Sequence, residues 1–133
     1  MPVVHQHAKI LVVEDDQLSQ TIITTMLSKM GYQTDVAGNG LEALRLLSEQ
    51  YFDLVLMDCQ MPVMDGYTAA RCITSKNSGH RSLNQEVMII ALTADCTDHV
   101  KSECVQVGMH DFITKPVRMQ QLQETIIRWL TKA

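Results

Sequence analysis

The sequence of 133 residues lacks any apolar stretch that approaches the ~20 residues a helix needs to cross a bilayer. Its first residues also lack the charged region and the long apolar segment of a signal peptide. We therefore expect a cytoplasmic location and no direct membrane contact. Residues 1–8 are interpreted as a tail or a linker remnant, and residues 9–132 as one domain.

Basic residues and paired cysteines are also scarce. The chain has 11 Lys and Arg against 15 Asp and Glu, and its formal net charge is −4. Because DNA affinity comes largely from basic side chains on phosphates, this balance argues against direct nucleic-acid binding. The 4 cysteines form no C-x-x-C pair and fit no zinc-binding spacing, so we interpret them as reduced, partly buried thiols.

What the chain does have is a set of short apolar runs that each end on a polar residue. Run 10–13 leads into Glu14, Asp15 and Asp16, run 54–57 into Asp58, run 88–92 into Thr93, and run 112–114 into Lys115. If these runs are parallel strands, their polar ends meet at the edge where open α/β sheets bind ligands. Carboxylates, a hydroxyl and an ammonium group together suit a hard cation and a phosphoryl group.

The runs alternate with helical patterns, which is typical of βαβ units and a parallel sheet. The predicted strands are 9–14, 33–37, 53–58, 88–92 and 110–114, and the predicted helices are 17–30, 41–50, 67–75, 95–107 and 119–132. Asp16 and Asn39 are expected to cap helices, and Gly31 and Gly108 to end them. A long exposed loop is expected over 76–86.

Right-handed crossovers then place helices on both faces of the sheet, giving a three-layer α/β/α sandwich. Apolar spacing places Leu41, Leu44 and Leu47 on one face of their helix, and it predicts that Leu122, Ile126, Ile127 and Leu130 of the last helix point inward. Alternation leaves the strand order open. The flavodoxin-like order 2-1-3-4-5 would make the first and third strands neighbours and bring Asp15 and Asp58 together.

The strand-end residues suggest a chemical role for each group. The Asp58 carboxylate could attack a phosphoryl group, with Lys115 and Thr93 contacting the phosphoryl oxygens. Two other classes fit less well. In a flavodoxin-like cofactor protein the acidic residues after the first strand would repel the cofactor phosphate. An aspartyl-nucleophile phosphatase has D-x-D at the nucleophile, whereas position 60 here is Gln.

At these residues the chain resembles the receiver domain of two-component response regulators, over residues 9–132. The matching motifs are residues 10–16, 56–66, 90–94 and 115–116, in the family's order and spacing. Segments 61–66 and 90–94 are closest in style to receivers of hybrid sensor histidine kinases. The resemblance implies a phosphoacceptor signalling domain of a phosphorelay, with self-phosphorylation and autodephosphorylation as its only reactions. A stand-alone response regulator is the alternative, and a degenerate receiver that only binds partners is disfavoured by the intact motifs.

The resemblance also implies a role for particular residues. Asp58 would accept phosphate from a phosphohistidine on a histidine kinase or a histidine phosphotransfer domain. Magnesium, or manganese in its place, would be bound by Glu14, Asp15, Asp58 and the backbone carbonyl of Gln60. Thr93, Ala94, Phe112 and Lys115 would bind the phosphoryl group or switch with it, Gln60 and Asp95 would tune its lifetime, and the Lys115–Pro116 peptide would be cis.

Two departures from the family pattern stand out. The acidic pair is Glu-Asp rather than Asp-Asp, which should keep the metal. Phe112 stands at an aromatic position that often holds Tyr, so it can change rotamer with Thr93 but has no hydroxyl to donate. Leu18 and Ile22, near the acidic edge, are hypothesised to form a partner surface.

Overall fold

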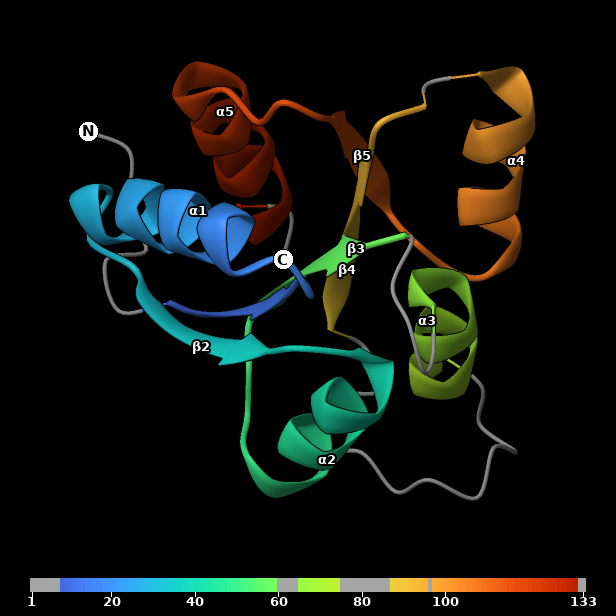
Figure 1. Cartoon of the computed structure of the whole chain (residues 1–133), viewed down its shortest axis with the longest axis horizontal. Helices are drawn as coiled ribbons and strands as arrows, with labels where there is room; N and C mark the ends of the chain where they lie inside the picture. The colour runs from blue at the N-terminus through green and yellow to red at the C-terminus, as the bar shows by residue number, and fades with distance from the viewer. Residues whose placement is uncertain (1–7, 60–64, 75–86, 96, 132–133) are drawn as a thin grey trace.

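The computed structural model describes residues 8–59, 65–74, 87–95 and 97–131, which form one parallel sheet between two layers of helices (Figure 1). The strands are β1 (Lys9–Val13), β2 (Gln33–Ala37), β3 (Leu54–Asp58), β4 (Met88–Thr93) and β5 (Asp111–Thr114). The helices are α1 (Gln17–Lys29), α2 (Gly40–Glu49), α3 (Gly66–Thr74), α4 (Asp98–Gln106) and α5 (Met119–Leu130).

The strand order is β2-β1-β3-β4-β5, with every neighbouring pair parallel, so the predicted fold class is confirmed. β1 and β3 are adjacent, and Val13 lies opposite Met57. The residues that follow these two strands therefore leave the sheet side by side. β4 and β5 extend the sheet on the other side of β3, with Thr93 opposite Thr114.

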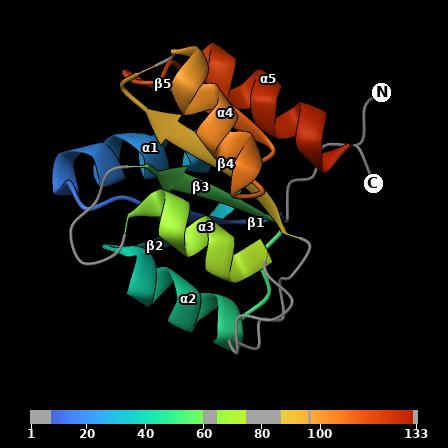
Figure 2. The same ribbon diagram turned by 90° about the vertical axis from the view of Figure 1, so that its right-hand side faces the viewer.

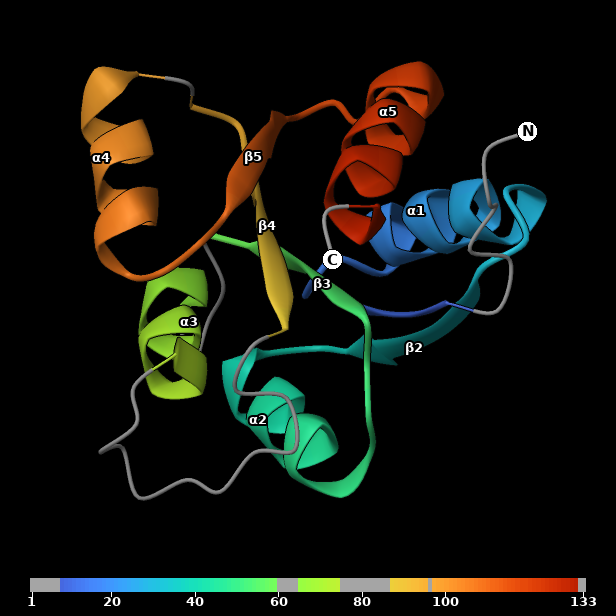
Figure 3. The same ribbon diagram turned by 180° about the vertical axis from the view of Figure 1, so that it is seen from behind.

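The two helical layers are unequal. α1 and α5 cover one face of the sheet, whereas α2, α3 and α4 lie together on the other, with α3 between its neighbours (Figures 2 and 3). Because successive strand residues point to opposite faces, β1 sends Ile10 and Val12 toward α1 and α5. Its Leu11 and Val13 face the layer of three helices. The central strands are apolar on both faces for this reason.

Several helix ends form as the sequence predicts. The Asp16 carboxylate accepts the Ser19 N–H at 2.9 Å, and the Asn39 side chain accepts the Glu42 N–H at 2.9 Å. Gly31 and Gly108, after α1 and α4, have φ values of 92° and 89°. These left-handed conformations suit glycine and end each helix.

The start of α4 corrects one prediction. The helix begins at Asp98 rather than Asp95, because the Asp95 carboxylate accepts the Thr97 N–H at 2.9 Å and so stabilises a turn there. Thr97 then acts as the N-cap and accepts the Val100 N–H.

Leu41 departs from the apolar face on which the sequence places it, and the prediction that Ile127 points inward is wrong. Leu41 is 50% exposed, since the buried stripe of α2 is formed by Gly40, Ala43, Leu44 and Leu47. Ile127 is 43% exposed, because Leu122, Thr125 and Ile126 form the buried stripe of α5. The predicted loop 76–86 lies outside the described residues. None of the helices in the described part of the chain has the length and apolar character to span a bilayer.

Candidate phosphoacceptor site

Glu14, Asp58 and Lys115 converge at the carboxyl ends of β1, β3 and β5. Asp58 is the last residue of β3, whereas Glu14 and Lys115 come directly after β1 and β5. Strand alternation explains the convergence, because each lies two positions after a residue that faces α1 and α5. The Lys115 ammonium lies 3.0 Å from a Glu14 carboxylate oxygen and 3.1 Å from one of Asp58. Glu14 and Asp58 are buried, at 1% and 4% exposure. The predicted meeting of these strand ends is therefore present in the structure.

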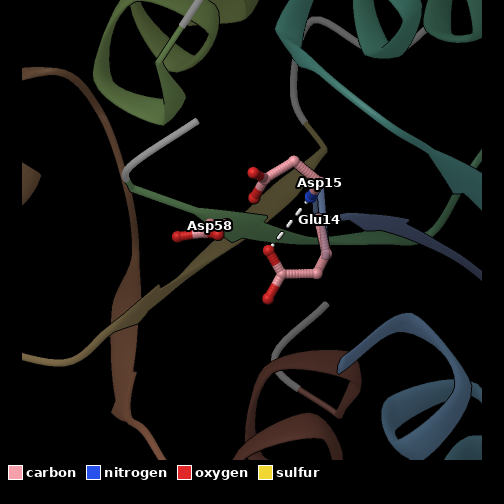
Figure 4. Close-up of side chains that lie close together, drawn as sticks. All are labelled: Glu14, Asp15 and Asp58. Carbon is pink, nitrogen blue, oxygen red and sulfur yellow. Dashed lines mark hydrogen bonds between the residues drawn. The ribbon is translucent and has the colours of Figure 1, made fainter. Parts of the chain in front are cut away.

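Asp15 completes an acidic cluster. One carboxylate oxygen from each of Glu14, Asp15 and Asp58 lies within 4.8 Å of the others (Figure 4). The Asp15 N–H donates to a Glu14 carboxylate oxygen at 3.0 Å, while the Asp15 side chain faces solvent. Hard oxygen ligands with access to water fit Mg²⁺, which keeps several waters when it binds one or two carboxylates. The residues present therefore fit a hard divalent cation.

Burial and close charges shift the pKa values in this cluster. Burial, followed by a hydrogen bond to Asp58, raises the pKa of Glu14 to about 7, although Lys115 opposes the change. Burial lowers the pKa of Lys115, but its hydrogen bonds to Glu14 and Asp58 outweigh burial and raise that pKa above its ordinary value. The ammonium group is thus charged at neutral pH beside a carboxyl group that is close to its titration point.

Thr93 and Phe112 occupy the other side of the sheet edge. The Thr93 hydroxyl donates to the Asp95 carbonyl oxygen at 2.9 Å and accepts the Asp95 N–H at 3.0 Å. Both hydrogen bonds of the Thr93 hydroxyl are therefore made to the backbone of the turn that follows β4. The half-buried Phe112 packs against the core on the α4 face, with the Lys101 ammonium 5.2 Å from its ring centroid. Ala94 and Asp95 are exposed.

The backbone around Asp58 is tightly enclosed. A Cβ at Gly66 would lie 2.1 Å from the Asp58 carbonyl oxygen, so only glycine lets α3 begin this close to the end of β3. The Lys115–Pro116 peptide is cis, as the family resemblance implies. Gln60 lies outside the described residues, so its expected carbonyl ligand has no geometry here.

Two contacts at the site were not anticipated from the sequence. The Gln20 side chain donates to the Glu14 carbonyl oxygen, and Lys101 lies over Phe112. Both join a helix residue to a residue in or directly after a strand, and no local pattern in the sequence marks such a contact. The β1–β3 juxtaposition, by contrast, followed from the strand order.

A groove of about 540 Å³ runs from the cluster along α1. It is lined by Glu14, Ser19, Ile22, Ile23, Lys115, Pro116 and Val117. Leu18, one residue before Ser19 on α1, is 69% exposed, and Ile22 is 44% exposed. Apolar side chains therefore lie exposed beside the acidic cluster.

Comparison with known proteins agrees with this geometry. The family model of the response regulator receiver domain matches residues 10–127. Hybrid signal transduction histidine kinase K of Dictyostelium discoideum is 36% identical over 120 residues, a match covering 89% of this chain. Histidine kinase 5 of Arabidopsis thaliana is 36% identical over 143 residues, covering 92% of this chain. The matches span only 10% and 16% of these two relatives.

Solved structures give the same result. The receiver domain of a sensor histidine kinase from Pseudomonas aeruginosa, with a magnesium ion in its active site cleft, has a TM-score of 0.82 and 39% identity. The match covers 95% of this chain and 99% of that one. The receiver domain of yeast Ssk1, in complex with the histidine phosphotransfer protein Ypd1, has a TM-score of 0.84 and 32% identity, covering 94% and 90%. With its fold, its acidic strand ends and these relatives in agreement, the chain belongs to the response regulator receiver domain family.

Proposed function

We propose that Asp58 is the residue that accepts a phosphoryl group in a two-component phosphorelay. One observation carries the proposal: the buried Asp58 carboxylate lies 3.1 Å from the Lys115 ammonium, within a cluster that also contains Glu14 and Asp15. The carboxylate supplies the nucleophile, and its neighbours supply the charges that phosphoryl transfer requires.

Phosphohistidine can donate the phosphoryl group to Asp58 in a single transfer step. A carboxylate oxygen of Asp58 forms a bond to phosphorus while the phosphorus–nitrogen bond breaks. The imidazole leaves with the electron pair and takes up a proton. Lys115, already beside Asp58, pairs with an oxygen of the transferred group. Mg²⁺, or Mn²⁺, bound by Glu14, Asp15, Asp58 and the Gln60 carbonyl would neutralise charge on the phosphoryl oxygens.

The response to phosphorylation would begin at Thr93. Its hydroxyl exchanges its bond to the Asp95 carbonyl for a bond to the phosphoryl group, next to Ala94. The half-buried Phe112, on the same side of the sheet as α4, then changes its rotamer. By the family resemblance, Asp95 and Gln60 would set how fast water removes the phosphoryl group. Self-phosphorylation and autodephosphorylation are the only reactions proposed for the domain.

A histidine kinase or a histidine phosphotransfer domain is the proposed donor. The yeast receiver that was solved with its phosphotransfer protein supports this class of partner, and the exposed Leu18 and Ile22 offer it an apolar surface. The similarity to hybrid kinases supports an origin as the receiver of such a kinase, with a stand-alone regulator as the alternative. The domain limits 9–132 and the cytoplasmic location stay predictions from the sequence.

Intact-mass measurement tests the acceptor directly. The native chain is incubated with Mg²⁺ and acetyl phosphate, beside Asp58→Asn and a sample with chelator. We expect a gain of one phosphoryl group in the native chain, but not in Asp58→Asn or in the sample with chelator. Asp53→Asn is a matched control, because Asp53 is an exposed carboxylate before the start of β3. Addition of the phosphoryl group to Asp58→Asn would contradict the proposal. If the native chain gains no mass, binding of beryllium fluoride is measured next. Binding would indicate a phosphorylated product that is too short-lived to detect, and no binding would indicate a site that accepts no phosphoryl group.

A further inference from the structure

Hydrogen bonds from Ser19 and Gln20, near the start of α1, hold the loop between β1 and α1 in place. The Ser19 N–H and hydroxyl both donate to the Asp16 carboxylate at 2.9 Å. The Gln20 N–H donates to the Asp16 carbonyl oxygen at 2.9 Å, which is the first backbone bond of the helix. The Gln20 side-chain amide reaches further back and donates to the Glu14 carbonyl oxygen. One residue of α1 thus binds both ends of the three-residue segment 14–16.

Hydrogen bonds hold the backbone on both sides of Glu14, the residue before Asp15. The Glu14 N–H donates to the Ala37 carbonyl oxygen of β2 at 3.0 Å, so β2 and Gln20 fix the two sides of the Glu14 backbone. Within the described part of the chain, no side chain donates a hydrogen bond to the Asp15 carboxylate. Its direction therefore depends on the backbone between Glu14 and Asp16. A carbonyl oxygen only accepts, so the Gln20 amide must present its N–H₂ group to it.

We propose that Gln20 is a positioning residue for the acidic cluster. It acts through the Glu14 carbonyl and keeps the Glu14 and Asp15 carboxylates converged with Asp58 before any cation binds. The inference rests on the proposed function, because it assigns Gln20 a role in divalent-cation binding by that same site. Partners behind the ligands of a metal site commonly change metal affinity about 10- to 100-fold when they are removed.

Gln20→Met isolates the hydrogen bond. Methionine has similar length and helix propensity, so α1 keeps its stability while the donor is lost. Gln17→Met is the matched control, because Gln17 lies on the same helix close to the cluster but is exposed. Affinity for Mg²⁺ is measured by calorimetry, and the unfolding of the metal-free proteins is followed by circular dichroism. We expect Gln20→Met to bind Mg²⁺ about tenfold more weakly and Gln17→Met to bind it as the native chain does.

Gln20→Glu provides a second variant in which charge and position act in opposite directions. Its added negative charge alone would strengthen cation binding, whereas loss of the donor beside the Glu14 carbonyl would weaken it. We expect weaker binding at neutral pH. Stronger binding by Gln20→Glu, or unchanged binding by Gln20→Met, would overturn the role of Gln20 and leave the proposed function intact.

Failure of the proposed function gives a different result. In that case the native chain binds no Mg²⁺ and gains no phosphoryl group. A variant that loses metal affinity only in proportion to a loss of folded protein, as circular dichroism would show, also overturns the positioning role. A tenfold weaker affinity in fully folded Gln20→Met supports it.

Discussion

The Lys115 ammonium nitrogen lies 3.1 Å from a carboxylate oxygen of Asp58 and 3.0 Å from one of Glu14. One cation therefore compensates two buried carboxylates from different strands. Removing it leaves them facing one another with little water. The same contact that would pair with a phosphoryl group in the proposed reaction is therefore expected to stabilise the metal-free fold.

Lys115→Gln should lower the free energy of unfolding of the metal-free protein by about 2 kcal/mol, less than for a fully buried pair because Lys115 is partly exposed. Urea titration in the presence of a chelator measures this. Lys29→Gln, an exposed change in the last turn of α1, should cost only a few tenths of a kcal/mol. Mg²⁺ should restore much of the loss. Equal urea midpoints for Lys115→Gln and the native chain would contradict the prediction.

Glu14 makes the stability of the metal-free protein depend on pH. Burial, and then its hydrogen bond to Asp58, raises its pKa from 4.5 to about 7. The folded state therefore binds more protons than the unfolded state between these values, so stability falls as pH rises across this window. The loss should not exceed about 3 kcal/mol.

Urea unfolding of the metal-free protein between pH 4.5 and pH 8 measures this dependence. Glu14→Gln cannot ionise, so its stability should change less across the same range. If the two proteins show parallel pH profiles, Glu14 does not titrate as its surroundings imply.

Gly66 is required by the backbone of the acceptor residue. In Gly66→Ala the new Cβ would lie 2.1 Å from the Asp58 carbonyl oxygen, and backbone on both sides of the contact must move. We expect a loss of about 3 kcal/mol in unfolding free energy and slower phosphorylation by acetyl phosphate.

Gly38→Ala is the control for Gly66→Ala. Its Cβ would lie 3.6 Å from a Glu42 carboxylate oxygen, which is an ordinary contact. Thermal unfolding and mass spectrometry should find this variant close to native. A native melting temperature for Gly66→Ala would show that α3 moves away from β3 at little cost.

The strands and two helix starts could be predicted because they depend on local patterns, which leave the strand order open. Apolar runs mark the strands, and Asp16 and Asn39 mark helix starts through bonds to residues three positions on. Once β1 and β3 are neighbours, the convergence of Asp15 and Asp58 follows from geometry.

Other features depend on competition between similar local signals or on distant contacts. Asp95 and Thr97 both favour a cap, and only the structure shows that Thr97 is the N-cap of α4. Leu41 matches the apolar period of α2 but is 50% exposed at its first turn. The contact of Gln20 with the Glu14 carbonyl requires the path of the loop, which sequence spacing does not give.

Lys101 should influence the conformation of Phe112. Its ammonium group lies 5.2 Å from the ring centroid, a cation–π geometry worth about 0.5–1 kcal/mol at a partly exposed site. A double-mutant cycle with Lys101→Met and Phe112→Leu should give a coupling energy of that size in urea unfolding. Additive effects of the two changes would show that the contact contributes nothing. Phe112 has no hydroxyl group whose hydrogen bond could hold its ring in place. Lys101→Met should therefore also change the populations of the Phe112 ring rotamers. NMR of a fluorinated phenylalanine measures these populations.

Leu18 should contribute to recognition of a phosphodonor protein without affecting the chemistry. It is 69% exposed on α1, next to the groove that runs from Glu14 and Lys115 toward Val117. Leu18→Gln keeps helix propensity while removing apolar area. We expect transfer from a phosphorylated histidine phosphotransfer protein to slow by at least about fivefold. Phosphorylation by acetyl phosphate should be unchanged, because that donor needs no protein surface.

Leu41→Gln is the matched control for Leu18, since Leu41 is 50% exposed on α2, in the opposite helical layer. It should leave both reactions unchanged. If Leu18→Gln slows both donors equally, Leu18 acts on the site and not on the partner. If it slows neither, the donor approaches the acidic cluster from another side. Rapid-quench measurements with the two donors distinguish these results, because a surface contact changes only the reaction that requires the protein partner.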